Sequence, residues 1–305
     1  MSHPSIVSLT ARVVSSTAGP PLAALSVGRF VGREIVLVTV ECADGTVGYG
    51  EAFHGQAGAA VAELVNTVLQ PIVVGRSPSE TADVSELVRR RYLVSHGASS
   101  VFRLALSGID MAMWDAHGKV LKLPVYRLLG GSATSIPVYA GGFALGIQPP
   151  DELVVEARRL VDSGWTTALK LRLGETPVSD LARVRAVREA FGDEMRLMVD
   201  ANLGTEMLRI AAVTSAAGVR FVPHISHSVI NHAAALHVLS AIASRDLCEG
   251  DASPVNDFRD RIVTGGVVWR DGRGVLSDAP GLGVTVDEHA VQAALAGGGA
   301  GDYSA

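Results

Sequence analysis

The chain has 305 residues, of which 48% are hydrophobic and 19% are charged. This length allows about two domains with sizeable cores, and the composition excludes a disordered chain. With 26 Lys and Arg against 31 Asp and Glu, the net charge is −5, so no basic excess is available for phosphates and we expect no nucleic-acid partner.

Cysteine usage and hydropathy indicate the compartment. The two cysteines, Cys42 and Cys248, are far apart in the sequence, which favours reduced thiols over a disulfide framework. The first residues lack a basic segment followed by an apolar one. The most apolar stretch, 233–243, contains His237 and is shorter than the roughly 20 residues of a membrane span. We therefore expect a cytoplasmic protein with no membrane segment.

The first 130 residues combine β and then α patterns. Residues 35–40 are a β-branched run, and Asp44-Gly45 follows before a second apolar run, which is a strong hairpin signal. Helical periodicity then predicts three helices, at residues 58–69, 79–92 and 99–120. This region is expected to be α+β.

Residues 131–250 change to strands that alternate with amphipathic helices, which predicts βα units and a parallel sheet. The expected strands are 136–140, 167–173, 196–200, 218–224 and 247–249, and the expected helices are 150–161, 179–191, 205–217 and 231–243. Residues 251–305 are rich in Gly and Asp with one β run at 265–270, and the tail from Gly297 is expected to fray.

Several stretches resemble one family in the right order. Residues 105–119 (ALSGIDMAMWDAHGK) and 123–131 (LPVYRLLGG) resemble the signature of the mandelate racemase/muconate-lactonising branch of the enolase superfamily. Three shorter stretches agree with it, namely 168–172 (ALKLR), 198–202 (MVDAN) and 222–224 (VPH).

The resemblance implies a fold and a division of the chain. The family has an α+β capping domain followed by a modified (β/α)8 barrel, and its C-terminal segment returns to the cap. Here these parts would be residues 1–130, residues 131–250 and residues 251–305. The expected fold class is therefore α/β plus α+β.

The same resemblance implies a reaction. The family abstracts the proton α to a substrate carboxylate, and a Mg²⁺ held by three carboxylates stabilises the enediolate, because this weakly acidic proton leaves a dianion that needs concentrated positive charge. Asp200 matches the first metal ligand, and Asn202 its polar neighbour. An Asp at the end of a strand can alternatively cap the next helix.

The predicted catalytic residues depart from the family pattern at one position. Lys170 and Arg172 match a Lys-x-Lys motif, but arginine stays protonated and is a poor base, although it can pair with a carboxylate. Ordinary ion pairs are the alternative for both. His224 matches the base for the opposite face of the substrate. Glu249 matches an acidic residue that contacts substrate, with an exposed loop acid as its alternative.

Other residues near these stretches are assigned by resemblance or by spacing. Phe53 and His54 lie in a segment that matches a substrate-covering loop. His232 and His237 are five residues apart and do not share a helix face well, so we expect both to be structural. Asp115 in the signature helix is expected to hold the cap to the barrel.

The barrel is incomplete in this sequence. Five strands are predicted instead of eight, and three βα units, about 75–90 residues, are missing after Asn202. In the family these units carry the second and third metal carboxylates and the Asp that orients the catalytic His. Glu206 lies in the wrong helix and Asp246, Asp251 and Asp257 are expected in late loops, so none stands in the matching context. The Mg²⁺ site is therefore expected to be weak or absent. Five strands would leave an open sheet with exposed edges, which favours a homo-oligomer.

Several functions remain open from the sequence. With arginine at position 172, His224 becomes the sole candidate base, which favours a sugar-acid dehydratase acting on a small carboxylate. The alternatives are a racemase or epimerase, a cycloisomerase, or a catalytically inactive remnant that acts as an oligomer partner. A further alternative is that the units are missing only from the sequence as written.

Overall fold

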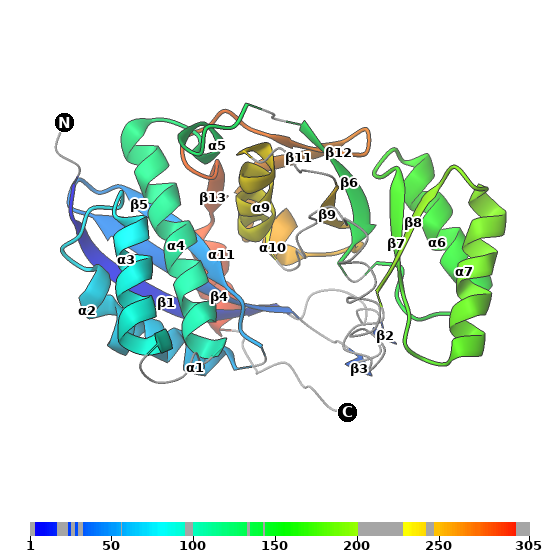
Figure 1. Ribbon diagram of the computed structural model, residues 1–305, viewed down its shortest axis with the longest axis horizontal. Helices are drawn as coiled ribbons and strands as arrows, with labels where there is room; N and C mark the ends of the chain where they lie inside the picture. Colours follow the sequence, from blue (N-terminus) through cyan, green and yellow to red (C-terminus); the bar gives the residue numbers. More distant parts are fainter. Residues whose placement is uncertain are drawn as a thin grey trace.

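The computed structural model describes residues 4–16, 24–25, 28–29, 33–55, 57–94, 100–132, 135–142, 144–200, 228–241 and 247–296. Figure 1 shows an antiparallel sheet with its helices at one end, and β7, β8, α6 and α7 at the other. Strands β6, β9, β11 and β12 and helix α9 lie between them. The predicted helix 205–217 and strand 218–224 lie outside the described residues.

The N-terminal sheet has the order β1-β4-β5 and is antiparallel. Its strands are β1 (Ile6–Ser16), β4 (Arg33–Cys42) and β5 (Val47–Ala52), and a separate short pair is formed by β2 (Ala24–Leu25) and β3 (Gly28–Arg29). The turn between β4 and β5 contains Gly45 at φ 82°, a conformation that glycine adopts without strain. The predicted hairpin at Asp44-Gly45 is confirmed.

Helices follow this sheet where the periodicity predicts them. They are α1 (Gly58–Glu63), the π-helical η1 (Leu64–Leu69), α2 (Gln70–Val73), α3 (Thr81–Val88), the π-helical η2 (Arg89–Val94), α4 (Ser100–Leu121) and α5 (Val125–Leu128). The predicted single helix at 58–69 is thus an α-helix continued by a π-helical segment. A buried cluster that includes Val38, Val65 and Ile109 joins these helices to the sheet.

Helix α4 approaches the sheet closely at two glycines. A Cβ at Gly108 would lie 2.8 Å from Val38 Cγ2 and 2.9 Å from Ala52 Cβ, and a Cβ at Gly50 would collide with the backbone of Gly108. Such separations are closer than real Cβ contacts. The small residues of the signature helix are therefore required by this packing.

We expect Gly108→Ala to lower the free energy of unfolding by about 1–3 kcal/mol, because the added methyl group overpacks the interface between helix and sheet. Urea denaturation checks this. Ser107→Ala on the same helix is the control, because Ser107 is exposed and its hydroxyl bonds only within the helix, to Leu104 O. Equal stability of the two variants would contradict the close approach.

The second sheet contains four parallel strands in the order β9-β6-β7-β8. They are β6 (Ser135–Gly141), β7 (Ala168–Arg172), β8 (Arg196–Asp200) and β9 (Cys248–Asp251). Antiparallel strands β11 (Val267–Arg270) and β12 (Arg273–Leu276) extend the sheet beside the first residues of β6. This gives a six-stranded sheet, and within the described residues no closed barrel forms.

Three helices pack on this sheet: α6 (Pro150–Asp162), α7 (Pro177–Phe191) and α9 (Val229–Ala241). Helix α6 begins with a proline followed by Asp151 and Glu152, and the Thr176 side chain caps α7 by accepting from Ser179 N–H, both strong helix starts. Leu160 and Val187 pack with β7, whereas Leu236 packs with β6 and β9. The predicted helices 150–161 and 179–191 are confirmed within two residues at each end, and the predicted start of 231–243 is confirmed to the same accuracy, whereas residues 242–243 lie outside the described residues.

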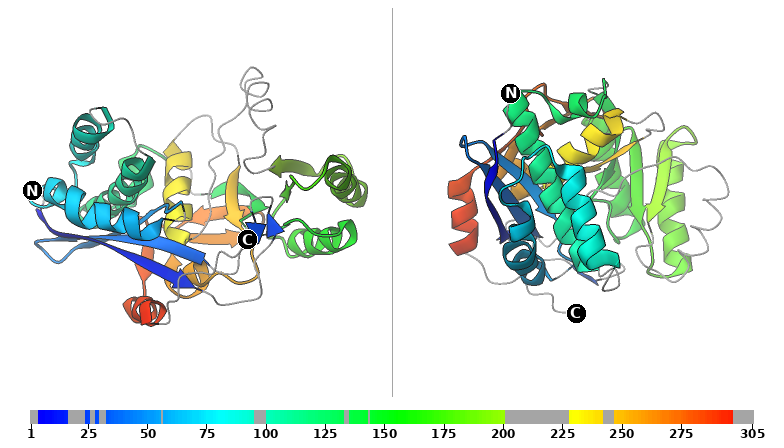
Figure 2. Two further views of the ribbon diagram at one scale, coloured as in Figure 1. Left: turned by 90° about the horizontal axis from the view of Figure 1, so that it is seen from below. Right: turned by 60° about the vertical axis from the view of Figure 1, so that its left-hand side comes forward.

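The C-terminal segment packs on the N-terminal sheet. It contains α10 (Asp257–Asp260), β10 (Val263–Gly265), β13 (Val284–Val286) and α11 (Glu288–Ala296), and Figure 2 shows α11 beside the N-terminal strands. Buried Phe258 belongs to a core cluster with Val14 and Leu37. The buried Asp115 carboxylate accepts Tyr49 N–H at 2.9 Å and Leu282 N–H at 2.8 Å. Asp115 therefore has a structural role, but these contacts join α4 to β5 and to the C-terminal segment and not to the predicted barrel region.

Among the helices of the described ranges, none combines the length and apolar character needed to cross a membrane.

Candidate active site at the strand ends

The carboxyl ends of the parallel strands bring four of the predicted residues together. Lys170 and Arg172 are two residues apart on β7 and therefore point to the same side of the sheet. The strand register places Arg172 beside Asp200 of β8 and Tyr139 of β6 beside Glu249 of β9. Parallel strands end at one edge of a sheet, which is where ligand sites of α/β proteins are found.

The four side chains form one ionic group, which we call the strand-end cluster (Lys170, Arg172, Asp200 and Glu249). Lys170 Nζ lies 3.0 Å from Asp200 Oδ2 and 3.3 Å from Glu249 Oε1. Arg172 forms a hydrogen-bonded ion pair with Asp200, and its Nη2 lies 3.6 Å from Glu249 Oε1. Two cations thus face two carboxylates, and the cluster is balanced in charge.

Backbone groups fix two members of the cluster. Arg172 Nη2 donates to Gly142 O at 2.6 Å, and Gly142 N–H donates to Glu249 Oε1 at 3.3 Å. A Cβ at Gly141 would lie 2.7 Å from Glu249 Cγ, so this glycine leaves room for the carboxylate. The Glu249 side chain is fully buried and that of Arg172 is 3% exposed. Glu249 is therefore not the exposed loop acid that the sequence left as an alternative.

Tyr139 is a neighbour of the cluster that sequence reasoning missed. Burial, followed by the charge of Glu249, raises the pKa of the Tyr139 phenol well above its usual value. Lys170 Nζ lies 5.6 Å from the centre of its ring, within cation–π range. The signal that could have identified Tyr139 is its position opposite Glu249 in the sheet. That pairing joins residues 110 positions apart, which a local sequence pattern does not reveal.

The described residues do not fit a divalent cation at this place. Mg²⁺ requires several oxygen ligands with near-octahedral geometry. Across the ranges that the structure describes, no group of three or more His, Cys, Asp or Glu side chains is placed to hold a metal. The carboxylate of Asp200, the predicted first ligand, is already contacted by Lys170 and Arg172.

The other predicted site residues are not part of the strand-end cluster, and two of them lie outside the described residues. Phe53 is 50% exposed after β5, whereas His54 is buried with its Nδ1 3.6 Å from Glu34 Oε1. Burial lowers the pKa of His54 and outweighs the opposite effect of Glu34. Asn202 and His224 lie outside the described residues.

A second buried ionic group, which we call the Asp251 network, joins β4 to the loop after β9. Arg33 Nη1 lies 2.8 Å from Asp251 Oδ2. The same carboxylate accepts from Asn256 Nδ2 at 2.9 Å and from Ser253 N–H at 2.9 Å. Burial raises the pKa of Asp251, but the charge of Arg33 and the hydrogen bonds from Ser253, together with the nearby His232, outweigh it and hold the pKa below its usual range. The prediction that Asp251 lies in a late loop was wrong, because Asp251 ends β9 and pairs with Gly141 of β6.

The two histidines of α9 are structural, as predicted. His232 Nε2 accepts Asp251 N–H at 3.1 Å, and His237 Nδ1 accepts Tyr126 N–H at 2.9 Å. Burial lowers the pKa of His237 to about 4. At neutral pH this imidazole is therefore uncharged.

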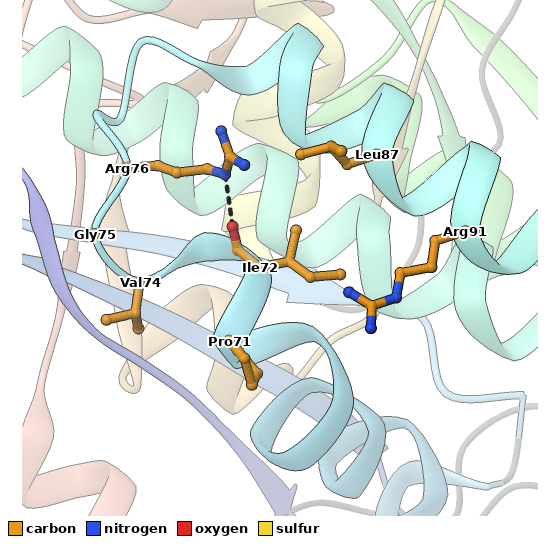
Figure 3. Close-up of a pocket in the computed structure, with 7 residues that line it drawn as sticks. All are labelled: Pro71, Ile72, Val74, Gly75, Arg76, Leu87 and Arg91. Atoms are coloured by element: carbon orange, nitrogen blue, oxygen red, sulfur yellow. Dashed lines mark hydrogen bonds between the residues drawn. The ribbon is translucent and has the colours of Figure 1, made fainter.

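A pocket of about 390 Å³ lies on the N-terminal part, between α2 and α3 with η2 (Figure 3). Its rim includes Arg76, whose Nε donates to Ile72 O at 2.7 Å. The lining residues are Pro71, Ile72, Val74, Gly75, Arg76, Leu87 and Arg91. None of them is a predicted site residue.

Comparison of the sequence with family patterns finds two matches. The pattern described as "Mandelate racemase / muconate lactonizing enzyme, N-terminal domain" matches residues 8–130. The pattern described as "Enolase C-terminal domain-like" matches in two segments, residues 152–205 and 204–290. The two segments meet where the sequence predicts the missing βα units, which is consistent with a shortened C-terminal domain.

Curated relatives include sugar-acid lyases and isomerases. The chain is 33% identical to 3,6-anhydro-alpha-L-galactonate cycloisomerase of Streptomyces coelicolor, over 58% of this chain and 48% of the relative. It is 30% identical to arabinonate dehydratase of Saccharolobus solfataricus, over 55% and 45%. It is 36% identical to D-galactarolactone cycloisomerase of Agrobacterium fabrum, over 58% and 46%. The matched part thus spans about half the length of these relatives.

Solved structures share the fold. A member of the enolase superfamily from Polaromonas sp. JS666 matches with a TM-score of 0.85 and 31% identity, over 95% of this chain and 97% of that one. A racemase from Streptomyces coelicolor A3(2) with bound magnesium matches with a TM-score of 0.78 and 22% identity, over 94% and 99%.

Proposed function

Because this chain belongs to the mandelate racemase/muconate lactonizing enzyme family of the enolase superfamily, we propose that it acts on a small sugar-acid carboxylate. The proposed reaction is dehydration, in which the proton α to the carboxylate is removed and the β-hydroxyl leaves. The observation that carries the proposal is the strand-end cluster, where Lys170 and Arg172 meet Asp200 and Glu249. The names of the relatives, arabinonate dehydratase among them, support a sugar acid.

The reaction balances with one residue that both takes and returns a proton. The base removes the α-proton, and the electron pair of the C–H bond forms the double bond to the β-carbon as the β C–O bond breaks. The protonated base then gives its proton to the leaving hydroxide, which departs as water, and the enol product becomes a 2-keto acid. Proton transfer of this kind contributes about 10²–10⁴-fold to a rate. We assign this base to His224, as the family resemblance implies.

Lys170 and Arg172 have a different role in the proposal. Removal of the α-proton increases the negative charge on the substrate carboxylate, and a preorganised cation at that place stabilises the transition state. Glu249 and Asn202 are proposed to contact substrate, and Phe53 and His54 to cover it. The family chemistry uses Mg²⁺ on Asp200, but the described residues do not fit that ion, so no step here depends on it.

The finer architecture is part of the same proposal. We propose an incomplete (β/α) barrel of about five strands, with the unit boundaries at residues 130 and 250 and a C-terminal segment, 251–305, that returns to the cap. The two-segment match of the C-terminal domain supports the shortening. An open sheet leaves strand edges that pair readily with another chain, which supports a homo-oligomer.

Hydrogen exchange at the α-carbon tests the reaction. Arabinonate and galactonate incubated with the protein in D₂O should lose their α-proton signal in ¹H NMR, and a 2-keto acid should form. Lys170→Met is expected to reduce the exchange rate at least about 100-fold, by loss of a preorganised charge. Lys122→Met is the matched control, because Lys122 is exposed and outside the cluster. Equal rates in both variants would contradict the role of Lys170.

A second candidate is a catalytically inactive family member that acts as an oligomer partner. The charge balance of the strand-end cluster favours it, because both cations already have carboxylate partners. Exchange without elimination would instead favour a racemase, an epimerase or a cycloisomerase. A wild-type protein that exchanges no α-proton would support the inactive member.

A further inference from the structure

We propose that Arg172 and Lys170 take the place of a divalent cation on Asp200, so that the strand-end cluster assembles without metal. Both cations contact the same oxygen, Oδ2 of Asp200. A metal ion bound at this oxygen would have to displace one or both of them, because a third positive charge at contact distance would be repelled by the two cations already there. The described residues therefore do not fit a magnesium site because Lys170 and Arg172 occupy the carboxylate oxygen that the metal would need.

Arg172 is held too firmly to be displaced at low cost. Its side chain is 3% exposed, and the same guanidinium that binds Asp200 also donates to Gly142 O at 2.6 Å. Arginine stays charged when buried, and its planar fork suits several acceptors at once. Moving it away from Asp200 would take a buried charge out of its hydrogen-bonded ion pair, which is unfavourable.

Charge balance points the same way. Glu249 is fully buried and lies between Lys170, at 3.3 Å, and Arg172, at 3.6 Å. Two carboxylates with two cations need no further positive charge. The one-residue difference from Lys-x-Lys thus has a structural meaning, since arginine reaches both Asp200 and the Gly142 carbonyl.

This inference deepens the proposed function. What it implies for catalysis rests on that proposed function. Positive charge for the substrate carboxylate would come from Lys170 and Arg172, and the reaction would then proceed in the presence of EDTA. The assembly without metal can be measured separately, through metal binding and thermal unfolding.

The first test compares wild-type protein in EDTA, in 10 mM MgCl₂ and with Mn²⁺ followed by electron paramagnetic resonance. We expect the midpoint of thermal unfolding to shift by less than about 1 °C between EDTA and Mg²⁺. We also expect the resonance signal of free Mn²⁺ to be unchanged when the protein is added. A site of sub-millimolar affinity would instead raise the midpoint by about 5 °C. That rise, or stoichiometric Mn²⁺ binding that Asp200→Asn abolishes, would overturn the inference.

Variants at position 172 provide the second test. Arg172→Met removes one cation, so Mg²⁺ is expected to raise its midpoint by at least about 2 °C relative to EDTA, whereas Arg172→Lys keeps the charge and should respond little. Arg159→Met is the control, since Arg159 is exposed on α6. If Arg172→Met does not fold, the inference is tested by comparing the Mn²⁺ binding of wild-type protein with that of Asp200→Asn. No Mg²⁺ response of a folded Arg172→Met would count against the inference.

The two proposals fail separately. If no α-proton exchange occurs in Mg²⁺ and none occurs in EDTA, the proposed function is overturned, but the metal-binding result still stands. Exchange that requires Mg²⁺ supports the proposed function and overturns metal-free assembly. Exchange that persists in EDTA supports both.

Discussion

Asp251→Asn is expected to lower the free energy of unfolding by about 3–5 kcal/mol, because it leaves the buried Arg33 guanidinium without its counter-charge. The two side chains are almost completely buried and lie 2.8 Å apart. Arg33 also donates to a neutral partner, Ser253 Oγ, at 2.8 Å. Equilibrium unfolding in urea measures the loss.

The control for this prediction is Asp271→Asn, an exposed position with φ 52° that asparagine tolerates. It should change stability by less than about 0.5 kcal/mol. The double variant Arg33→Met/Asp251→Asn should be more stable than the sum of the single effects implies, because it no longer buries an unpaired charge. Additive effects would show that the pair does not act as one unit.

Glu51 gives the second large effect, which depends on pH. Its side chain is buried, Ser228 Oγ donates to it, and burial raises the pKa of its carboxyl from 4.5 to about 7. The folded state therefore holds this proton more tightly than the unfolded state. Folding stability is unaffected below about pH 4.5, falls as the pH rises to 7, and is lower by about 3 kcal/mol at pH 8.

Glu51→Gln removes this titration and keeps an oxygen that accepts from Ser228. Its stability should match wild-type near pH 5 and exceed it by about 3 kcal/mol at pH 8, as measured by urea unfolding across that range. Glu63→Gln, at an exposed position of α1, should follow the wild-type profile. A Glu51→Gln profile parallel to wild-type would show that the carboxyl titrates normally.

Local patterns predicted most of the described elements. Proline and acidic residues at the start of α6, the Asp44-Gly45 turn and the β-branched run of β4 depend on neighbours in sequence, and each was confirmed. The cluster of Lys170, Arg172, Asp200 and Glu249 was predicted through resemblance, because strand alternation alone does not tell which strands are adjacent.

The contacts that the sequence did not predict join distant residues. Tyr139 lies beside Glu249 only because β9 pairs with β6, and Arg33 meets Asp251 across 218 positions. Such contacts depend on the tertiary register and on shared burial, which composition and periodicity do not encode. The roles of Asn202 and His224 and the three-part division of the chain stay predictions.

The measurement that tests this account most directly is α-proton exchange by wild-type protein in D₂O, with arabinonate or galactonate and EDTA, followed by ¹H NMR. The account predicts loss of the α-proton signal and formation of a 2-keto acid in EDTA, with the same rate after Mg²⁺ is added. An α-proton signal that persists with both acids, in EDTA and in Mg²⁺, would contradict it.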